Sequence, residues 1–486
     1  MQYDVIILGS GLAGLYAALH LGQCAPAPRV LILSKQSPTD SGSALAQGGV
    51  AAVLEEDDDS FVLHAEDTLI AGNYINDKAA VDALVTEGPQ DVRHVMDLGV
   101  EFDRNAQGEL NKTLEGGHSR RRIVHHKDQT GKEMVDKLLP HVLALPNVTL
   151  LEDATACFAV RTKNGFAIDA ICGDGAQRFF CRALLLATGG IGRVYRYTTN
   201  PAVSTGDGIR LAYELGAKTK RLHFIQFHPT AFAAQNDEDP FLISEAIRGE
   251  GAYLLNCYHR RFMQNYDQRL ELAPRDVVSR SILMESRRVG SRHFYLDIRH
   301  RGAAFLQKRF PAIDAACKVR GIDIASDFIP VFPCQHYLMG GVDVDLCGRT
   351  CVPGLYAAGE CAHTGLHGGN RLASNSLPEA LVFSRHAAND ILSYLQKTPQ
   401  SGCDAVALPY RSAAQEISTA LKDEIRATMQ HAFFVFPEVA ALPSGASRMR
   451  EIYETLRTGD YAVTRDYAET LSLACVAALI LEELLS

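Results

Sequence analysis

A short glycine-rich segment near the N-terminus has the residue types and spacing that could bind a phosphate. It matches the pattern G-x-G-x-x-G, which in dinucleotide-binding proteins joins a strand to a helix. The first glycine allows a tight turn, the second lets the backbone approach a pyrophosphate, and the third lets the helix pack on the sheet. By itself the pattern is weak evidence, because a glycine-rich core turn also produces it. The segment is Gly9-Ser10-Gly11-Leu12-Ala13-Gly14.

The residues around this turn predict the elements that must position it. Residues 5–8 and 30–33 are apolar runs that predict strands, and residues 12–21 between them predict an amphipathic helix. A third apolar run, 184–187, also ends in glycines, and residues 354–360 repeat the pattern of a strand followed by glycine. We therefore expect a dinucleotide-binding domain that is discontinuous in the sequence.

Lys35 stands at the end of the second predicted strand, where an acidic residue usually binds a ribose hydroxyl. A lysine at this position can pair with a phosphate or cap the pocket. A solvated lysine is an equally good interpretation.

Other segments combine glycine with charged or imidazole side chains, which protein interiors do not hold without a partner. Such segments are typical of loops that build a site. They are residues 114–119, 226–230, 244–251, 273–276, 336–341 and 367–377. The acidic run 55–59 and the basic run 120–122 are instead interpreted as solvated charges.

The middle of the chain has its own turn signals at His228-Pro229-Thr230, near Asp239-Pro240, and between Pro330 and Pro333. This pattern predicts an inserted α+β capping domain. From about Pro409 the sequence predicts long amphipathic helices and few strands.

The spacing of Ile417, Leu421 and Ile425 supports a C-terminal helical bundle. The predicted fold class is α/β, with a discontinuous Rossmann-like domain over residues 1–222 and 341–400. The capping domain covers 223–340 and the helical domain 401–486.

The composition of the 486 residues is that of an ordinary globular protein, with 47% hydrophobic and 22% charged residues. The 57 acidic and 48 basic residues give a net charge of −9, which argues against binding to nucleic acid or a membrane surface. No run of 18 apolar residues and no basic leader is present. We expect a cytoplasmic protein with no stable membrane association.

Twelve cysteines are scattered along the chain without a CxxC pair or a Cys/His cluster at zinc spacing, and Cys347 and Cys351 come closest. In a long chain with no secretion signal, this pattern predicts free thiols and no metal site.

Eight motifs occur in one order between about residues 3 and 395. They are Gly9-x-Gly11-x-x-Gly14, Ala46-Gln47-Gly48-Gly49, Thr205-Gly206-Asp207-Gly208, His228-Pro229-Thr230, Pro274-Arg275-Asp276, His336-Tyr337 with Gly340-Gly341, Ala358-Gly359-Glu360 and Asn370-Arg371-x-Ala373-Ser374-Asn375-Ser376-Leu377. In this order they resemble the fumarate reductase/succinate dehydrogenase flavoprotein family. Within that family the chain is most similar to the members that oxidise aspartate.

The resemblance implies FAD as cofactor, bound non-covalently, because Gly42 stands where relatives with covalent FAD carry histidine. The first turn would line the pyrophosphate, Lys35 would replace the acidic ribose ligand, and residues 42–49 would follow the flavin. The implied cofactor residues are Gly9, Ser10, Gly11, Leu12, Ala13, Gly14, Lys35, Gly42, Ser43, Ala44, Leu45, Ala46, Gln47, Gly48, Gly49, Thr155, Ala156, Asp207, Glu360, Ser376 and Leu377.

The same resemblance implies a dicarboxylate substrate beside the flavin. A buried diacid needs cationic or hydrogen-bonding partners for both carboxylates. The implied substrate residues are Glu115, Gln226, His228, Ser244, His336 and Arg371. Glu115 would pair with an ammonium, which favours L-aspartate over a diacid without an amine.

Arg275 follows Pro274 at a predicted helix start, with the proline at the first helical position and Val277, Val278 and Ile282 on an apolar face. The resemblance implies that Arg275 is the catalytic, proton-transferring residue. A guanidinium is a poor base, so a relay must drain the proton. The candidates, Glu245, Arg248 and Glu250, stay open at this stage, since a surface set of ion pairs explains them equally well.

The implied reaction passes a hydride from L-aspartate to flavin N5 and gives iminoaspartate. O2 (giving H2O2) or fumarate (giving succinate) would reoxidise FAD, and quinolinate synthase would receive the product by transient contact, as a first step of NAD biosynthesis. The alternatives are a soluble fumarate reductase or succinate dehydrogenase flavoprotein subunit and a non-catalytic FAD-binding protein. The subunit would need an electron partner, because the chain has no iron–sulfur or haem motif.

Overall fold

The structure is a computed structural model that describes residues 1–55, 58–173, 175–233, 241–398 and 415–486. Asp239-Pro240, Pro409 and the predicted boundary at 400/401 lie outside the described residues. So do two residues of the acidic run, 56 and 57.

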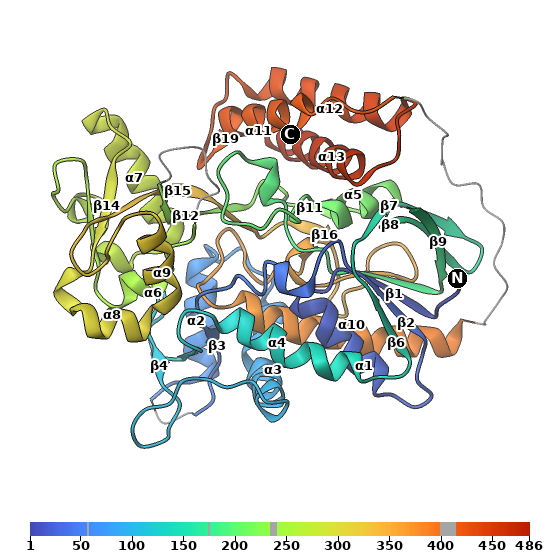
Figure 1. The fold of residues 1–486 in the computed structure, drawn as a ribbon, viewed down its shortest axis with the longest axis horizontal. Coiled ribbons are helices and arrows are strands. Elements are labelled where there is room, and N and C mark those ends of the chain that lie inside the picture. Colours follow the sequence, from blue (N-terminus) through green and yellow to red (C-terminus); the bar gives the residue numbers. More distant parts are fainter. Residues whose placement is uncertain (56–57, 174, 234–240, 399–414) are drawn as a thin grey trace.

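A five-stranded parallel sheet lies in the right half of Figure 1, where β1, β2 and β6 are labelled. Its order is β17-β10-β1-β2-β6, so the first strand pairs on one side with the next strand of the chain, β2, and on the other with the distant β10. This confirms the predicted Rossmann-like sheet. The strands are β1 (Val5–Leu8), β2 (Val30–Leu33), β6 (Val148–Leu151), β10 (Ala183–Leu186) and β17 (Leu355–Ala357).

The two faces of the sheet bury alternate residues, as the period of a strand requires. Val5 and Ile7 of β1 pack with helices α1 (Leu12–Gly22), α4 (Thr130–Leu143) and α10 (Ser376–Lys397). Ile6 and Leu8 belong to the core on the other face. That core includes residues of an antiparallel sheet of β7 (Ala154–Thr162), β8 (Gly165–Cys172) and β9 (Gly175–Cys181).

Helix α1 differs from the prediction of an amphipathic segment. Every residue of α1 except His20 is buried, because α4 and α10 both pack against the helix. An apolar helix in this position is a core helix.

Further helices and short strands complete this part of the chain. The helices are α2 (Phe61–Ala71), α3 (Lys78–Asp97) and α5 (Asp207–Glu214). The strands are β3 (Val50–Ala51), β4 (Lys112–Thr113), β5 (Ile123–Val124), β11 (Thr219–Lys220), β16 (Gly341–Asp343) and β18 (Ala362–His363).

A second unit, at the left of Figure 1, lies within residues 223–340 and has its own hydrophobic core. Its antiparallel sheet has the order β12-β15-β14-β13. The division into domains stays a prediction. The strands are β12 (Ile225–Phe232), β13 (Tyr253–Leu255), β14 (Phe294–Asp297) and β15 (Ile329–Leu338), and the helices are α6 (Glu245–Gly249), α7 (Arg275–Val289), α8 (Ala303–Arg309) and α9 (Pro311–Val319).

The C-terminal part is helical, at the top of Figure 1. It contains α11 (Ala420–Ala432), α12 (Leu442–Thr458) and α13 (Arg465–Leu485), with a hairpin of β19 (Phe433–Phe434) and β20 (Phe436–Pro437) between the first two. Leu421 and Ile425 lie on α11 as predicted, but Ile417 precedes the helix and is part of no helical face.

The hairpin connects the C-terminal helices to the second unit. The rings of Phe433 and Phe434 lie 5.9 and 5.2 Å from the ring of Phe227 on β12. Phe227 precedes a predicted substrate residue, so this packing supports the strand that carries the site.

Candidate active site

A cavity of about 510 Å³ opens at the carboxyl ends of β1, β2 and β10. Ligands of open parallel sheets bind at this edge. The cavity reaches from Lys35 and Thr155 at one end to Arg275 and Arg371 at the other.

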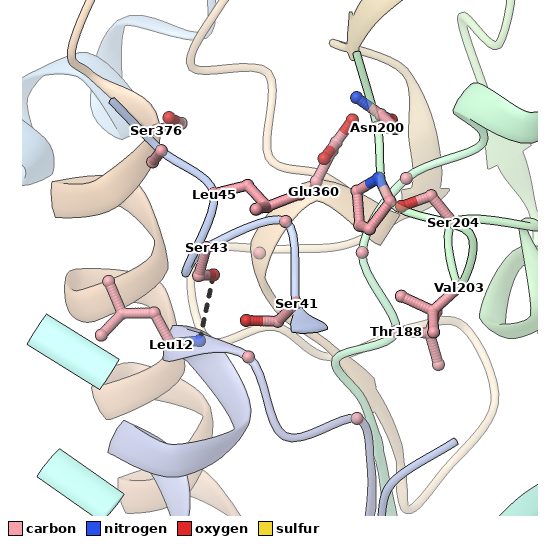
Figure 2. A pocket seen from close by; sticks show the side chains of 18 of the residues that line it. Leu12, Ser41, Ser43, Leu45, Thr188, Asn200, Val203, Ser204, Glu360 and Ser376 are labelled. Atoms are coloured by element: carbon pink, nitrogen blue, oxygen red, sulfur yellow. Dashed lines mark hydrogen bonds between the residues drawn. The ribbon is translucent and has the colours of Figure 1, made fainter. Parts of the chain in front are cut away.

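The turn between β1 and α1 needs glycine at two positions. A Cβ at Gly9, where φ is +108°, would lie 2.1 Å from the carbonyl oxygen of Ala187, and a Cβ at Gly14 would lie 2.1 Å from that of Gly9. Gly11 precedes the first turn of α1, and the Leu12 N–H donates to Ser43 Oγ at 3.1 Å, as Figure 2 shows. The turn therefore has the close packing predicted for a pyrophosphate-binding loop.

The cavity brings together most of the predicted cofactor residues. Gly14 and Ala44 do not line it, because Gly14 packs behind the turn and Ala44 belongs to the hydrophobic core. Those that line it are Gly9 to Ala13, Lys35, Gly42, Ser43, Leu45 to Gly49, Thr155, Ala156, Asp207, Glu360, Ser376 and Leu377.

Lys35 is not solvated, which corrects one interpretation of the sequence. Its Nζ lies 2.7 Å from Asp207 Oδ2 and 3.3 Å from Glu469 Oε1 on α13, and donates to Thr205 Oγ1 at 2.6 Å. Burial raises the pKa of Asp207, but Lys35 offsets this and the net pKa is lowered. The lysine thus forms the charged wall of the cavity at the end near Thr155.

Three polar groups in the cavity are suited to a ligand with N–H and O–H donors. Gln47 Oε1 and Asn200 Oδ1 are buried and have no hydrogen-bond partner among the described residues. Burial raises the pKa of Glu360 to about 7, although its carboxyl accepts the Leu338 N–H at 3.0 Å. Figure 2 shows Glu360 and Asn200 on the cavity wall, beside the loop of Ser41 and Ser43. The hydroxyls and ring N–H of FAD match such acceptors.

Two arginines meet at the other end of the cavity. Arg275 Nη1 donates to Gln226 Oε1 at 3.0 Å, and Arg371 Nη2 donates to the same oxygen at 3.2 Å. Gln226 does not line the cavity; the structure places its side chain oxygen between the two guanidiniums, and its predicted role in substrate binding stays a prediction. Burial first, and then Arg275, lower the pKa of Arg371 to about 10.

Two histidines lie beside these arginines with their rings 4.9 Å apart. Arg371 Nη2 donates to His336 Nε2 at 3.1 Å, so His336 Nδ1 carries the proton and donates to Thr199 Oγ1 at 2.8 Å. His228 Nδ1 accepts the Thr230 N–H at 3.2 Å, so Nε2 carries the proton; Nε2 has no hydrogen-bond partner among the described residues, and Glu245 Oε2 lies 4.0 Å away. Burial lowers the pKa of both histidines, so both are neutral.

A helix starts here as predicted, but its first residue is Arg275; Pro274, predicted at the first helical position, is the residue before the helix. Val278 and Ile282 are buried on the apolar face, and Val277 is half-buried. Arg275 Nε donates to Glu245 Oε2 at 2.6 Å.

Glu245 also links Arg275 to a second buried arginine, because its Oε1 accepts from Arg248 Nη2. Glu250, a third relay candidate, pairs with Arg301 at 3.1 Å instead. Ser244 lines the cavity and caps α6 by accepting the Ala246 N–H at 3.2 Å.

Glu115 is buried just outside the lining of the cavity. Its Oε2 accepts from Ser374 Oγ at 2.7 Å, and its Oε1 lies 3.3 Å from where a Cβ on Gly48 would stand. Burial raises the pKa of Glu115, while Arg275 and Ser374 lower it by less. Gly48 itself lines the cavity, so Oε1 lies next to a cavity residue that has no side chain.

Several residues that the structure brings to the site had no predicted role. Ser374 lay within a recognised motif, but nothing in its type indicated a contact with Glu115. For the segment after β10 the sequence did contain an indication of a site, because glycines follow a strand of the parallel sheet there. Cavity residues from this segment and the chain after it are Thr188, Thr199, Asn200, Val203 and Ser204.

Arg122 and Asp59 are exceptions to the interpretation of their two runs as solvated, whereas Glu55, Asp58, Arg120 and Arg121 are exposed. Arg122 is buried and pairs with Asp59 at 2.8 Å and with Asp67. Within the described ranges, no group of three or more metal-ligating side chains occurs, and no helix is long and apolar enough to cross a membrane. The eleven described cysteines, Cys347 and Cys351 among them, are free.

The fold and the cavity define a Rossmann-like flavoprotein. The family described as "FAD binding domain" matches residues 4–377. L-aspartate oxidase 1 of Ralstonia nicotianae is 41% identical over 100% of this chain and 93% of its own length. L-aspartate oxidase of Clostridium perfringens is 44% identical over 81% of this chain and 87% of its own length. The chain therefore belongs to the L-aspartate oxidase family of FAD-dependent oxidoreductases.

A solved structure of E. coli quinol fumarate reductase is similar over the whole fold. It is 28% identical, with a TM-score of 0.90, over 99% of this chain and 88% of that one. The likeness includes the C-terminal helices, where the sequence motifs had ended.

Proposed function

We propose that this protein oxidises L-aspartate to iminoaspartate with non-covalently bound FAD. The observation that carries the proposal is the position of Glu115, a buried carboxylate beside Gly48 of the cavity wall, near the cavity end where Arg275 and Glu245 lie. A diacid without an amine gains nothing from such a carboxylate, whereas an amino diacid pairs its ammonium with it.

The carboxylates of the substrate bind at the arginine end of the cavity. Among the described residues Arg371 forms no ion pair with a carboxylate; its Nη atoms donate to Ser376, Gln226 and His336, and its Nε has no hydrogen-bond partner. No protein carboxylate therefore pairs with this buried guanidinium, which suits it to contact a substrate carboxylate. His336, His228 Nε2 and Ser244 complete the carboxylate contacts.

The ammonium binds Glu115 Oε1 over Gly48. Its charge compensates the burial that raises the pKa of Glu115, so substrate binding favours the ionised carboxylate. This contact orients the Cα–H bond of the substrate toward the cofactor side of the cavity.

Arg275 and Glu245 move the proton that leaves the substrate amine. Arg275 is already protonated, so it can accept this proton only if it releases its own Nε proton to Glu245 Oε2. The two atoms are already joined by a hydrogen bond of 2.6 Å. Arg248 stabilises the ionised form of Glu245. This geometry favours Glu245 over Glu250 as the relay.

FAD, when bound, supplies the acceptor for the α-hydrogen of the substrate as a hydride. Gly42 has no side chain to attach a cofactor, and its nearest neighbour across the loop is Pro201 Cδ, 3.9 Å from an ideal Cβ. O2, giving H2O2, and fumarate, giving succinate, are the proposed electron acceptors. The product enters NAD biosynthesis in the cytoplasm, with transient delivery to quinolinate synthase.

The rival function is that of a fumarate reductase flavoprotein, which the similar solved structure supports. An anaerobic absorbance titration of the purified holoprotein distinguishes the two. Bleaching by L-aspartate with recovery on fumarate is expected. If aspartate does not bleach the flavin but fumarate reoxidises the dithionite-reduced protein, the rival function is assigned. If neither compound changes the flavin absorbance, the result indicates a non-catalytic FAD-binding protein.

A further inference from the structure

Ser374 has a strained backbone in the loop between Arg371 and α10. Its φ is 62°, in the left-handed region that side-chain-bearing residues rarely adopt. Such residues persist where the surroundings over-determine them, and they cluster at functional sites. The proposed reaction gives Ser374 no role of its own.

Two histidines hold the residues on either side of Ser374. His118 Nε2 donates to the Ala373 carbonyl at 2.8 Å, and His64 Nε2 lies 2.9 Å from Asn375 Oδ1. The carbonyl of Ser374 itself accepts the Ala51 N–H at 3.0 Å. The loop is therefore fixed before, at and after the strained residue.

His118 is itself anchored by a buried ion cluster. Because its Nε2 must donate to a carbonyl, its Nδ1 accepts from Arg122 Nη1 at 3.0 Å. Arg122 is paired with Asp59 and Asp67. Burial lowers the pKa of His118 to about 4, so this anchor does not change near neutral pH.

The direction of the hydroxyl bond of Ser374 follows from its second contact. The Gly49 N–H lies 3.2 Å from Ser374 Oγ and can only donate. The Ser374 hydroxyl hydrogen is therefore free to point at Glu115 Oε2, 2.7 Å away. This leaves Glu115 Oε1 directed over Gly48 toward the cavity.

We propose that Ser374 is a positioning residue that makes the site specific for an amino dicarboxylate over a dicarboxylate without an amine. It does so by orienting Glu115 and stabilising its ionised form. This inference rests on the proposed function, because it assigns the means by which the ammonium is recognised.

The Ser374 hydroxyl is one of several groups that set the pKa of Glu115. Burial raises the pKa of Glu115 and Glu245 adds to this, while Arg275, Ser374 and Arg309 lower it. Loss of the Ser374 hydroxyl keeps Glu115 neutral to a higher pH, and a neutral carboxyl attracts an ammonium less. Fumarate has no ammonium, so its reduction does not depend on this charge.

The test compares two holoenzyme variants. Ser374→Gly removes the hydroxyl and relieves the strained backbone, since glycine adopts this region freely. Ser384→Ala is the matched control, because Ser384 is also buried but its Oγ donates only to the Leu381 carbonyl of the same helix.

For Ser374→Gly we expect kcat/KM for L-aspartate to fall about tenfold to a hundredfold, the range for a hydrogen bond to a charged group. The acid limb of its pH profile moves to higher pH. Reoxidation of the reduced variant by fumarate stays within about threefold of wild type, as do both reactions of Ser384→Ala. Equal loss of both reactions, or a slower aspartate reaction with an unmoved acid limb, would overturn the proposal.

A second readout does not depend on aspartate turnover. Infrared difference spectra of the ligand-free holoenzyme, recorded over a pH titration, report the carboxyl band of Glu115, identified by its loss in Glu115→Gln. In Ser374→Gly the midpoint of this band should move to higher pH, and an unchanged midpoint would overturn the inference. If wild type does not react with aspartate, the proposed function fails, while the midpoint still decides whether Ser374 sets the charge of Glu115.

Discussion

Arg275 and Arg371 share one acceptor, Oε1 of Gln226, at 3.0 and 3.2 Å. The two guanidiniums come from α7 and from the loop before α10, which are almost a hundred residues apart. The amide also donates from Nε2 to Asn370 Oδ1 and to the Arg371 carbonyl. One neutral side chain thus holds two cations at the end of the cavity without neutralising either.

Gln226→Glu should weaken dicarboxylate binding. The new carboxylate would pair with both arginines and cancel one of the two charges that attract the substrate. The spectral Kd for succinate is expected to rise about tenfold or more, since each lost charge contact is worth roughly 1.4 kcal/mol or more.

Gln226→Met separates the added charge from the lost hydrogen bonds. It keeps the length of the side chain and should raise the Kd by less than Gln226→Glu does. A similar Kd for both variants would show that the hydrogen bonds, and not the neutrality of the amide, matter for binding.

Glu245→Gln should nearly abolish turnover. The variant leaves two buried arginines without their shared carboxylate and removes the proton acceptor of Arg275. Losses of a proton-transfer group are about 10²- to 10⁴-fold, and stopped-flow bleaching by aspartate measures this.

Glu250→Gln is the control for this variant. Glu250 lies at the end of the same helix but pairs with Arg301 and Arg309 at 3.1 and 3.7 Å. Its turnover should stay within about threefold of wild type, the scale of a partly exposed ion pair. A loss comparable to that of Glu245→Gln would contradict the assignment of the relay.

The sequence could predict the parts of this molecule that depend on local patterns. The turn of Gly9 to Gly14, the buried parallel strands and the helix start at Arg275 all follow from residues close together in the chain. Local patterns could not predict that α1 is buried almost all round, because one of the helices that pack against it, α10, begins more than 350 residues later.

The site contacts were out of reach for the same reason. Ser374 and Glu115 are 259 positions apart, and Lys35 meets Asp207 and Glu469 only in the folded chain. The burial of Arg122 was also not predictable from its run of basic residues, because its partners Asp59 and Asp67 lie more than 50 positions earlier in the chain. The family resemblance implied which residues belong to the site, but the hydrogen bonds between them follow only from the folded structure.

The pH dependence of aspartate oxidation should show an acid limb set by Glu115. Burial raises its pKa above the usual 4.5, so the carboxyl is neutral below that raised value and the ammonium loses its partner. We expect kcat/KM for aspartate to fall as the pH decreases through this pKa. The limb should disappear in Glu115→Gln, whose kcat/KM is uniformly low, and its persistence there would assign it to another group.

Glu360 should make the FAD-free protein less stable as the pH rises. Burial raises its pKa from 4.5 to about 7, so the folded state holds a proton that the unfolded state releases between these values. Stability is complete below pH 4.5, falls up to pH 7 and is then flat. The loss is about 3 kcal/mol, because each pKa unit is worth about 1.36 kcal/mol.

Urea unfolding of the FAD-free protein at pH 5 and pH 8 measures this effect. Glu360→Gln removes the titrating group and should make the difference between the two pH values smaller by an amount of that order. If the difference is the same in the variant, the pH dependence arises from other groups.

Gly48→Ala should block the ammonium position while leaving the carboxylate contacts in place. The backbone of Gly48 is not in the left-handed region, so alanine can adopt it. The new Cβ would lie 3.3 Å from Glu115 Oε1 and 3.4 Å from Ser374 Oγ, in the space through which an ammonium must reach the carboxylate. We expect KM for aspartate to rise about tenfold or more, with fumarate-driven reoxidation less affected, because the lost contact is a charged hydrogen bond.

Gly42→Ala adds a methyl to the same loop where the nearest atom is 3.9 Å away, so it reports the general effect of altering the loop on both reactions. Selective loss of aspartate oxidation in Gly48→Ala but not in Gly42→Ala would support recognition of the ammonium by Glu115, whereas parallel losses in the two variants would point to a disturbed flavin loop.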